Sequence, residues 1–106
     1  MFCNVRRYRV AQSEMDDLMH RVDTEFCEMV EHEPGFVAYQ ALDCGDGTLV
    51  TITTFRDEDA AEQSATTAAN FVRERLEGYT IERLDAWNGA VKVNRAVEEV
   101  LEAAHA

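Results

Sequence analysis

The clearest hydrophobic pattern lies between Gly35 and Arg56, where two apolar stretches flank the turn Cys44-Gly45-Asp46-Gly47. Both stretches are rich in aromatic and β-branched residues, and the two glycines can take positive φ, so the segment predicts a β-hairpin. Apolar residues fill both phases of the alternation. One phase holds Phe36, Ala38, Leu42, Leu49 and Phe55, and the other holds Val37, Tyr39, Ala41, Val50 and Ile52. Because successive strand residues point to opposite faces, we predict that the hairpin forms the centre of a sheet covered on both faces.

The chain before the hairpin predicts one strand and one helix. Phe2 to Val10 alternates loosely, as a strand does. Ser13 followed by Asp16 resembles a capping box and predicts a helix that runs to about Glu31. Apolar residues three and four positions apart give this helix one continuous stripe. The stripe consists of Met15, Leu18, Met19, Val22, Phe26, Met29 and Val30.

The chain after the hairpin predicts a second helix from about Glu58 to Glu77, capped by Asp57. Small residues dominate its inner face, which either brings the helix close to the sheet or leaves room for a ligand. This face holds Ala61, Ser64, Ala65, Ala68 and Ala69, followed by Phe71, Val72 and Leu76. Gly78 is expected to end the helix, and residues 79–87 then predict a fourth strand.

The last part of the chain contains Asn88-Gly89, a strong signal for a two-residue hairpin turn. We therefore predict that residues 90–94 fold back as a short fifth strand. Residues 95–106 carry apolar side chains at helical spacing and predict a C-terminal helix. The expected organisation is one domain over residues 1–94 and a helical tail over residues 95–106.

The order β-α-β-β-α-β with an antiparallel sheet is the α+β ferredoxin-like arrangement. Both helices lie on one face of such a sheet because the crossovers share one hand. The opposite face would then expose the apolar residues of the hairpin, a patch that monomers rarely tolerate. We therefore expect a homodimer in which the two sheets pack face to face.

The charge of the chain disfavours some classes of binding partner. The chain has 21 acidic and 10 basic residues and a net charge of −11, with Lys92 as its only lysine. Such a surface repels phosphate groups, so we expect neither a nucleic acid nor a membrane as partner. Heavy acidic usage with almost no lysine is also typical of proteins that stay soluble in concentrated salt. The N-terminus lacks a signal-peptide pattern and no apolar run approaches about 20 residues, so a cytoplasmic protein is expected.

Two short runs carry a family resemblance in addition to the order of elements. Glu33-Pro34-Gly35-Phe36-Val37-Ala38-Tyr39, Thr54-Phe55-Arg56-Asp57-Glu58 and the small-faced second helix resemble the antibiotic biosynthesis monooxygenase-like group of dimeric α/β-barrel proteins. The resemblance covers roughly residues 2–88. It implies a dimer in which each subunit holds a small pocket between sheet and helices. Members of the group oxygenate aromatic polyketides or quinols with dioxygen and without metal or flavin, degrade haem, or have no assigned activity.

The same resemblance disfavours haem breakdown. Haem-degrading members carry an Asn on the first strand and a Trp and a His on the second helix. This chain places Arg6 near the first of these positions, with Asn4 two residues away, and Ser64 near the tryptophan. Its second helix, residues 58–77, contains no histidine. We therefore expect no haem and no other cofactor.

A cofactor-free oxygenase must bind an acidic, electron-rich aromatic compound, help to remove its proton and stabilise the resulting anion. Asn4, Arg6 and Tyr8 share one face of the first strand and could act on one ligand. The full set of candidate pocket residues is Asn4, Arg6, Tyr8, Tyr39, Ser64, Ala68, Asn70, Tyr79 and Trp87.

Each candidate also has a structural explanation. Arg6, Arg7 and Arg9 could pair with neighbouring carboxylates, and the tyrosines could fill the core with their hydroxyls at its edge. Trp87 could cover the small fifth strand. The three histidines and three cysteines show no convincing metal spacing, so no metal is expected.

Two functions stay open from the sequence. The first is a cofactor-independent monooxygenase for a small aromatic or quinol-type compound. The alternative is a non-catalytic homodimer that binds a small apolar or aromatic ligand or has a structural or protective role. The absence of a well-placed histidine or acid in the expected pocket favours the alternative slightly.

Overall fold

Four antiparallel strands form a single sheet in the order β2-β3-β1-β4. The structure, a computed structural model, describes residues 1–97. The strands are β1 (Phe2–Val10), β2 (Phe36–Asp43), β3 (Thr48–Phe55) and β4 (Ile81–Ala90). This arrangement confirms the expected α+β ferredoxin-like fold. The hairpin does not form the centre of the sheet, however, because β2 lies at an edge and only β3 is central.

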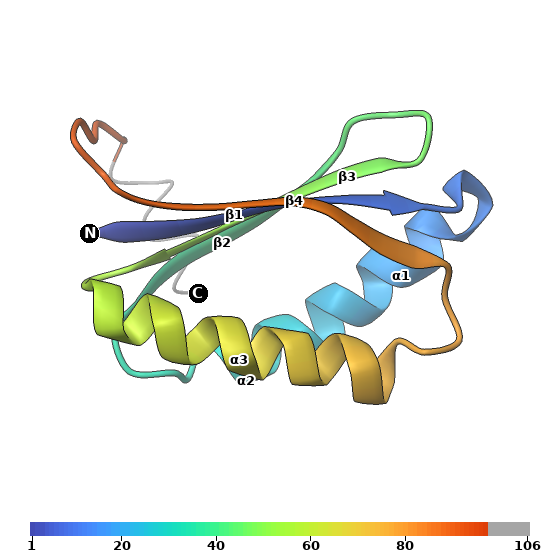
Figure 1. The fold of residues 1–106 in the computed structure, drawn as a ribbon, viewed down its shortest axis with the longest axis horizontal. Coiled ribbons are helices and arrows are strands. Elements are labelled where there is room, and N and C mark those ends of the chain that lie inside the picture. Colours follow the sequence, from blue (N-terminus) through green and yellow to red (C-terminus); the bar gives the residue numbers. More distant parts are fainter. Residues whose placement is uncertain (98–106) are drawn as a thin grey trace.

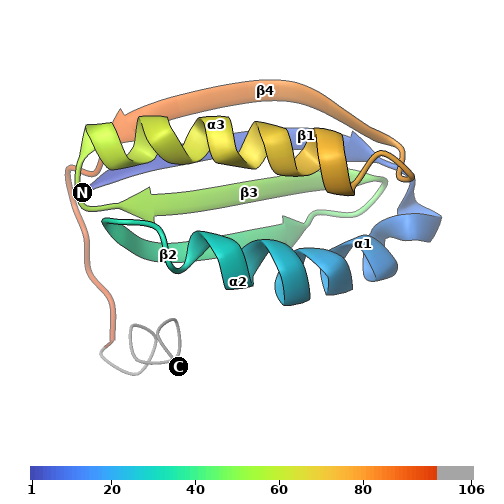
Figure 2. The same cartoon turned by 90° about the horizontal axis from the view of Figure 1, so that it is seen from below.

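The helices of residues 1–97 all lie on one face of the sheet, as Figure 1 shows. A 3-10 turn (Gln12–Glu14) leads into α1 (Met15–Arg21), a π-helical segment (Val22–Phe26) and α2 (Cys27–Val30), which together form one continuous helix. The second helix is α3 (Glu58–Arg75). Viewed from below, the two helices lie side by side and run in opposite directions (Figure 2). Between residues 1 and 97, no helix is long and apolar enough to cross a membrane.

The π-helical segment explains how the first helix buries its stripe. Leu18, Val22, Phe26 and Val30 are spaced four residues apart, whereas an α-helical turn takes about 3.6 residues. A stripe with this spacing would rotate away from the sheet in a regular α-helix, and the wider π turn compensates for the drift. All four side chains are buried. The predicted stripe is confirmed except at Met29, which is exposed.

Of the two predicted helix caps, the one at α3 is present and the one at the first helix is not. Asp57 caps α3 as expected, because the backbone N–H of Ala60 donates to Oδ1 of Asp57 at 2.9 Å. The capping box at Ser13 and Asp16 is wrong, since no side chain caps the start of the first helix. A 3-10 turn satisfies this end instead, with the N–H of Glu14 bonded to the carbonyl of Ala11 at 2.9 Å.

A bulge changes the phase of β2. The pairing of β2 with β3 shifts between Phe36 and Ala38, so Phe36 and Tyr39 both pack against the core although the sequence placed them in opposite phases. The ring of Phe36 meets Phe55 at a centroid distance of 6.1 Å, and the ring of Tyr39 meets Phe26 at 5.3 Å. The core therefore forms between the inner face of the sheet and both helices.

The predicted fifth strand is wrong. β4 continues straight through Asn88-Gly89, which pair with Asn4 and Cys3 of β1. Ladder hydrogen bonds along the whole of β1 override the local turn preference of these two residues. Ala90 is the last residue of β4, and residues 91–97 have no regular structure. Most of the predicted C-terminal helix, residues 98–106, lies outside the described residues.

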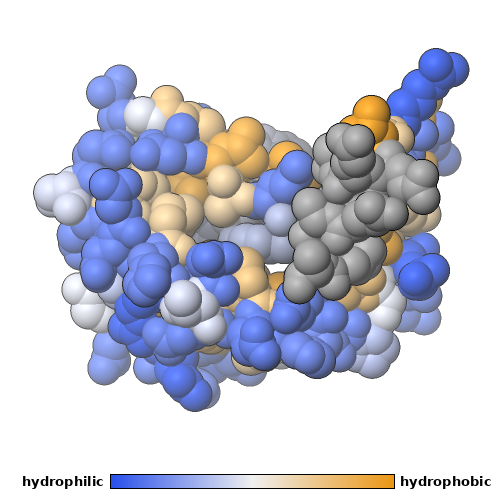
Figure 3. All heavy atoms as spheres, turned by 180° about the vertical axis from the view of Figure 1, so that it is seen from behind, coloured by the Kyte–Doolittle hydropathy of each residue, from blue (hydrophilic) through white to orange (hydrophobic). Residues whose placement is uncertain are grey.

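The outer face of the sheet carries no helix within the part of the chain that the structure describes (Figure 1). Apolar side chains meet across it, with Val5 opposite both Ile52 and Trp87, and Leu42 opposite Val50. Trp87 is 54% exposed and Leu42 is 43% exposed. Figure 3 shows the molecule from behind, a side from which the outer face is not seen face-on, and there too hydrophobic residues lie in the upper middle among hydrophilic ones. We call the residues Val5, Leu42, Val50, Ile52 and Trp87 the outer apolar patch.

Candidate functional site

A cavity of about 90 Å³ lies between the inner face of the sheet and the helices. It exists because α3 faces the sheet with small side chains, among them Ala65, Ala68 and Ala69. The residues that line it come from β1 to β4, α1, the π-helical segment, and α3 with its C-cap Leu76. They are Asn4, Arg6, Tyr8, Leu18, Val22, Phe26, Tyr39, Leu49, Thr51, Thr53, Ser64, Ala65, Ala68, Ala69, Phe71, Val72, Leu76, Ile81 and Arg83.

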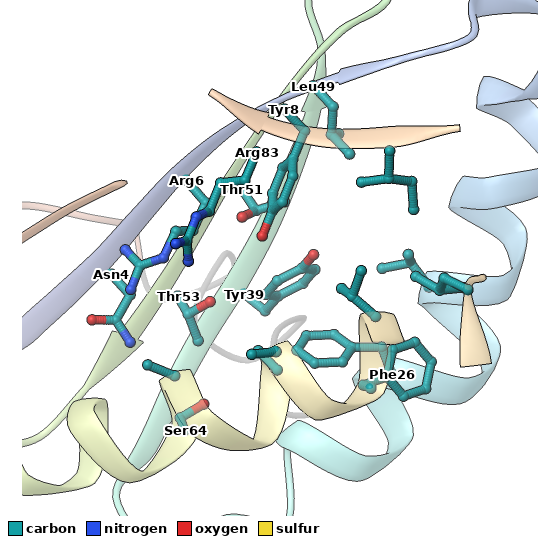
Figure 4. Close-up of a pocket in the computed structure, with 18 of the residues that line it drawn as sticks. Asn4, Arg6, Tyr8, Phe26, Tyr39, Leu49, Thr51, Thr53, Ser64 and Arg83 are labelled. Atoms are coloured by element: carbon teal, nitrogen blue, oxygen red, sulfur yellow. The ribbon is translucent and has the colours of Figure 1, made fainter. Parts of the chain in front are cut away.

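The cavity has two chemically different sides, as the close-up in Figure 4 shows. The helices contribute mainly apolar side chains, such as Phe26 and Phe71. The sheet contributes hydroxyl, amide and guanidinium groups from Asn4, Arg6, Tyr8, Tyr39, Thr51, Thr53 and Arg83. Apolar walls with a few convergent polar groups are typical of small-ligand sites.

The two tyrosines of the cavity are neutral phenols at neutral pH. Burial raises the pKa of Tyr8, and the opposing effects of Arg6, Arg83 and a hydrogen bond with Thr51 do not cancel this rise. Burial also raises the pKa of Tyr39, with further contributions from Cys27 and Tyr8. Both hydroxyls can therefore donate a hydrogen bond to a ligand, but neither can serve as a base.

Asn4 joins the sheet side of the cavity to α3, and Ser64 joins α3 to the segment that precedes β2. The side-chain Nδ2 of Asn4 donates to the carbonyl oxygen of Ala61 in α3 at 2.9 Å, and Asn4 is only 7% exposed. Ser64 interacts with the carboxyl of Glu33, whose pKa is raised by burial and lowered less by this hydrogen bond. The bond from Asn4 fixes the distance between β1 and α3 and so supports the cavity, whereas the Ser64–Glu33 contact joins α3 to the segment before β2.

Arg6 is held in place by the neighbouring strand. Its Nη1 donates to the carbonyl oxygens of Val5 and Trp87 at 2.9 and 3.0 Å, and to Oδ1 of Asn88 at 2.9 Å. Burial lowers the pKa of its guanidinium, Tyr8 opposes this effect, and the like charge of Arg83 lowers the pKa further.

The structure brings together six of the predicted pocket residues and separates the others. Asn4, Arg6, Tyr8, Tyr39, Ser64 and Ala68 all line the cavity. Asn70 lies instead in a groove between the two helices, and the Tyr79 hydroxyl donates to Asp17. Trp87 lies on the outer face of the sheet, so its predicted role as a cover for a fifth strand is wrong.

Of Arg6, Arg7 and Arg9, which could have paired with neighbouring carboxylates, only Arg7 does so within residues 1–97. Arg7 pairs with Asp85 at 2.5 Å on the outer face. Within residues 1–97, neither Arg6 nor Arg9 forms an ion pair.

Sequence reasoning missed Arg83, Thr51 and Thr53. The two threonines alternate with Leu49 and Phe55, the buried residues of β3, and this alternation could have identified them. Arg83 follows Ile81 on the inner face in the same way, but the extra residue Leu84 breaks the alternation directly afterwards.

The cavity does not fit a haem or a protein-bound metal. None of its lining residues is a histidine, cysteine, aspartate or glutamate, and a volume of about 90 Å³ is far below the several hundred that larger ligands need. Elsewhere, Glu28, Glu31 and His32 place their ligand atoms within 4.8 Å of one another, a proximity that sequence spacing did not suggest. All three are exposed on or just after α2, and none of them lines the cavity.

Comparisons with known proteins agree with this fold. Residues 1–70 match the family model described as antibiotic biosynthesis monooxygenase. No curated protein sequence matches the chain. The structure of MupZ from Pseudomonas fluorescens aligns with 82% of this chain, with a TM-score of 0.69 and 11% sequence identity. The alignment covers 65% of MupZ, so this chain spans less than two thirds of that protein.

Three further solved structures are matched over most of both chains. A dimeric ferredoxin-like protein from an uncultured marine organism is 11% identical with a TM-score of 0.67, over 91% of this chain and 98% of that one. The haem degrader MhuD from Mycobacterium tuberculosis is 19% identical with a TM-score of 0.66, over 91% of this chain and 100% of MhuD. SnoaB, a cofactor-independent oxygenase from Streptomyces nogalater, is 19% identical with a TM-score of 0.61, over 88% and 94%. At these identities the likeness shows the fold, not the activity.

Proposed function

Because this chain belongs to the antibiotic biosynthesis monooxygenase family, we propose that it is a homodimeric oxygenase that acts on a small aromatic or quinol-type compound without metal or flavin. The observation that carries this proposal is the composition of the cavity. Its helix side suits an aromatic ring, and its sheet side gathers hydrogen-bond donors where negative charge on the ring would be stabilised. SnoaB, with the same fold, is a cofactor-independent oxygenase.

The chemistry is divided between substrate and protein. An electron-rich aromatic compound with an acidic C–H or O–H loses a proton to water, because no lining residue can accept it, and the resulting anion reacts with dioxygen. One oxygen atom enters the substrate as a carbonyl and the other leaves as water. The neutral hydroxyls of Tyr8 and Tyr39 donate to the anion, and the guanidinium of Arg6 stabilises its charge. The apolar helix wall excludes water from the ring.

The size of the cavity sets a condition on binding. A cavity of about 150 Å³ holds a benzene molecule, whereas this one measures about 90 Å³. A ring therefore enters only when side chains at its mouth move aside. Arg83 is exposed and lines the cavity, so its side chain can move at little cost.

One observation favours the alternative, a non-catalytic binding protein. No lining residue can serve as a general base at neutral pH, since the cavity contains no histidine or carboxylate and both tyrosines have raised pKa values. Such a protein would bind the same aromatic compounds without converting them.

Oxygen uptake separates the two functions. Purified protein is incubated with a panel of hydroquinones and anthrones, and the oxygen consumed is compared with the product formed. Equal amounts, together with an increase in melting temperature on binding, support the oxygenase. An increase in melting temperature without oxygen uptake leaves the binding protein, and no response to any compound contradicts both functions.

The homodimer rests on the outer apolar patch. Replacing Ile52 by aspartate places a charge at its centre, between Val5 and Gln40. Burying one unpaired carboxylate from each subunit costs several kcal/mol, so we expect at least about a hundredfold weaker association. Sedimentation at micromolar concentration measures the change, and Thr66→Asp on the exposed side of α3 is the matched control. A monomeric unsubstituted protein, or a variant that still dimerises, would place the prediction in error.

A further inference from the structure

The cavity collects positive charge in a strongly acidic protein. Acidic residues outnumber basic ones by 21 to 10, yet the cavity is lined by two arginines and by no carboxylate. Both arginines lie on the same side of the cavity, where Arg6 extends towards Asn4 and Arg83 lies between Arg6 and Thr51 (Figure 4). With so many acids available, a purely structural arginine pair would be expected to face carboxylates.

The nearby acids of the sheet are placed elsewhere. Asp85 pairs with Arg7 on the outer face, and Glu82 lies opposite Arg9. Arg83 lies opposite Tyr8 in the β1–β4 pairing and forms no ion pair within residues 1–97. Two like charges on adjacent strands repel each other, so this arrangement costs free energy when the cavity is empty.

Arg6 is oriented for this role by β4. The contacts of its Nη1 with the carbonyl of Trp87 and with Asn88 leave Nη2 and Nε without acceptors in the described part of the chain. A guanidinium held on one side presents its other N–H groups as a fixed, planar pair of donors. Carboxylates match this geometry with two parallel hydrogen bonds.

We propose that Arg6 and Arg83 bind the carboxylate of an aromatic monocarboxylate whose ring occupies the cavity. This inference rests on the proposed function, since it names the class of compound that the cavity takes. The carboxylate relieves the repulsion between the two guanidinium groups, and the hydroxyl of Tyr8, which lines the same cavity, is a further hydrogen-bond donor for the ligand. The ring then contacts the small residues of α3 and the phenyl groups of Phe26 and Phe71.

Binding of two isosteric probes tests the proposal. Benzoate and benzamide have the same ring and differ in charge, and calorimetry in dilute buffer gives both dissociation constants. We expect benzoate to bind at least about tenfold more tightly, because charge-assisted hydrogen bonds are stronger than neutral ones. In Arg83→Gln, the affinity for benzoate should fall about tenfold while that for benzamide changes less than about twofold. Arg83→Lys keeps the positive charge but not the paired donors, so its affinity for the carboxylate probe should lie between those of the unsubstituted protein and Arg83→Gln.

Arg73→Gln is the matched control, since it removes the same charge from an exposed position on α3 outside the cavity. It should leave both affinities unchanged. Equal binding of the two probes to the unsubstituted protein, or an undiminished preference for benzoate in Arg83→Gln, would overturn the inference while leaving an aromatic pocket in place. Failure of both probes to bind would overturn the inference together with the proposed pocket. Thermal melting of each variant establishes that it is folded.

Discussion

Replacing Ala68 by tryptophan should abolish ligand binding and lower oxygen consumption by at least about a hundredfold. Ala68 lines the cavity from α3, and an indole ring is larger than the volume of about 90 Å³ that is present. The new side chain therefore occupies the place of the substrate ring. The effect should appear in kcat/KM with hydroquinones and in the loss of ligand-induced stabilisation.

The control for this substitution is Thr66→Trp, which adds the same ring to an exposed position of the same helix. Overpacking at Ala68 costs about 1–3 kcal/mol, so the melting temperature of each variant must be measured alongside its activity. Ala68→Leu fills only part of the space and should give an intermediate loss. Full activity in a folded Ala68→Trp protein would show that catalysis takes place outside this cavity.

The second large effect is expected at Gly47, where alanine should lower the free energy of unfolding by about 3 kcal/mol. Gly47 has a φ of +75°, a region that residues with a Cβ rarely adopt. A Cβ at this position would also lie 2.4 Å from the carbonyl oxygen of Val10. The carbonyl oxygen of Val10 belongs to the backbone and cannot rotate away as a side chain could. The N–H of Val10 also donates to the carbonyl oxygen of Gly47 at 2.8 Å. Moving the two residues apart to relieve the contact would therefore break this hydrogen bond.

Gly45 provides a matched control in the same turn. Its φ is +85°, but a Cβ there would meet nothing within 4 Å. Gly45→Ala should therefore lower the free energy of unfolding by about 1 kcal/mol, the cost of holding a residue with a Cβ at positive φ. Urea unfolding of both variants measures the difference. Equal losses would mean that the turn moves away from β1 freely, contrary to the close contact described above.

Much of the fold could be predicted from the sequence because it depends on periodicity. The stripe from Met15 to Val30 predicted the first helix, and the glycines of the β2–β3 turn take the positive φ values that their chemistry allows. The small inner face of α3 was also recognised, and with it the residues Ser64 and Ala68 that line the cavity.

What could not be predicted depends on pairing between distant strands. Local preference at Asn88-Gly89 favours a turn, but the available partners in β1 keep β4 extended. Regular alternation would place Trp87 on the same face as Ile81 and Arg83, but the extra residue at Leu84 moves Trp87 to the outer face and leaves Arg83 in the cavity. No property of a residue in isolation reveals such a shift. Asn70 was misplaced for a different reason, since it faces the groove between the helices and not the sheet.

The two register shifts of the sheet fall on its outermost strands, at Leu84 in β4 and next to Phe36 in β2. A flat, regular border offers unpaired N–H and C=O groups on which further strands can stack without limit. Both borders are distorted here, and growth into fibrils is thereby hindered at either side. In the proposed homodimer, self-recognition would then be confined to the outer apolar patch, a surface that closes after two copies.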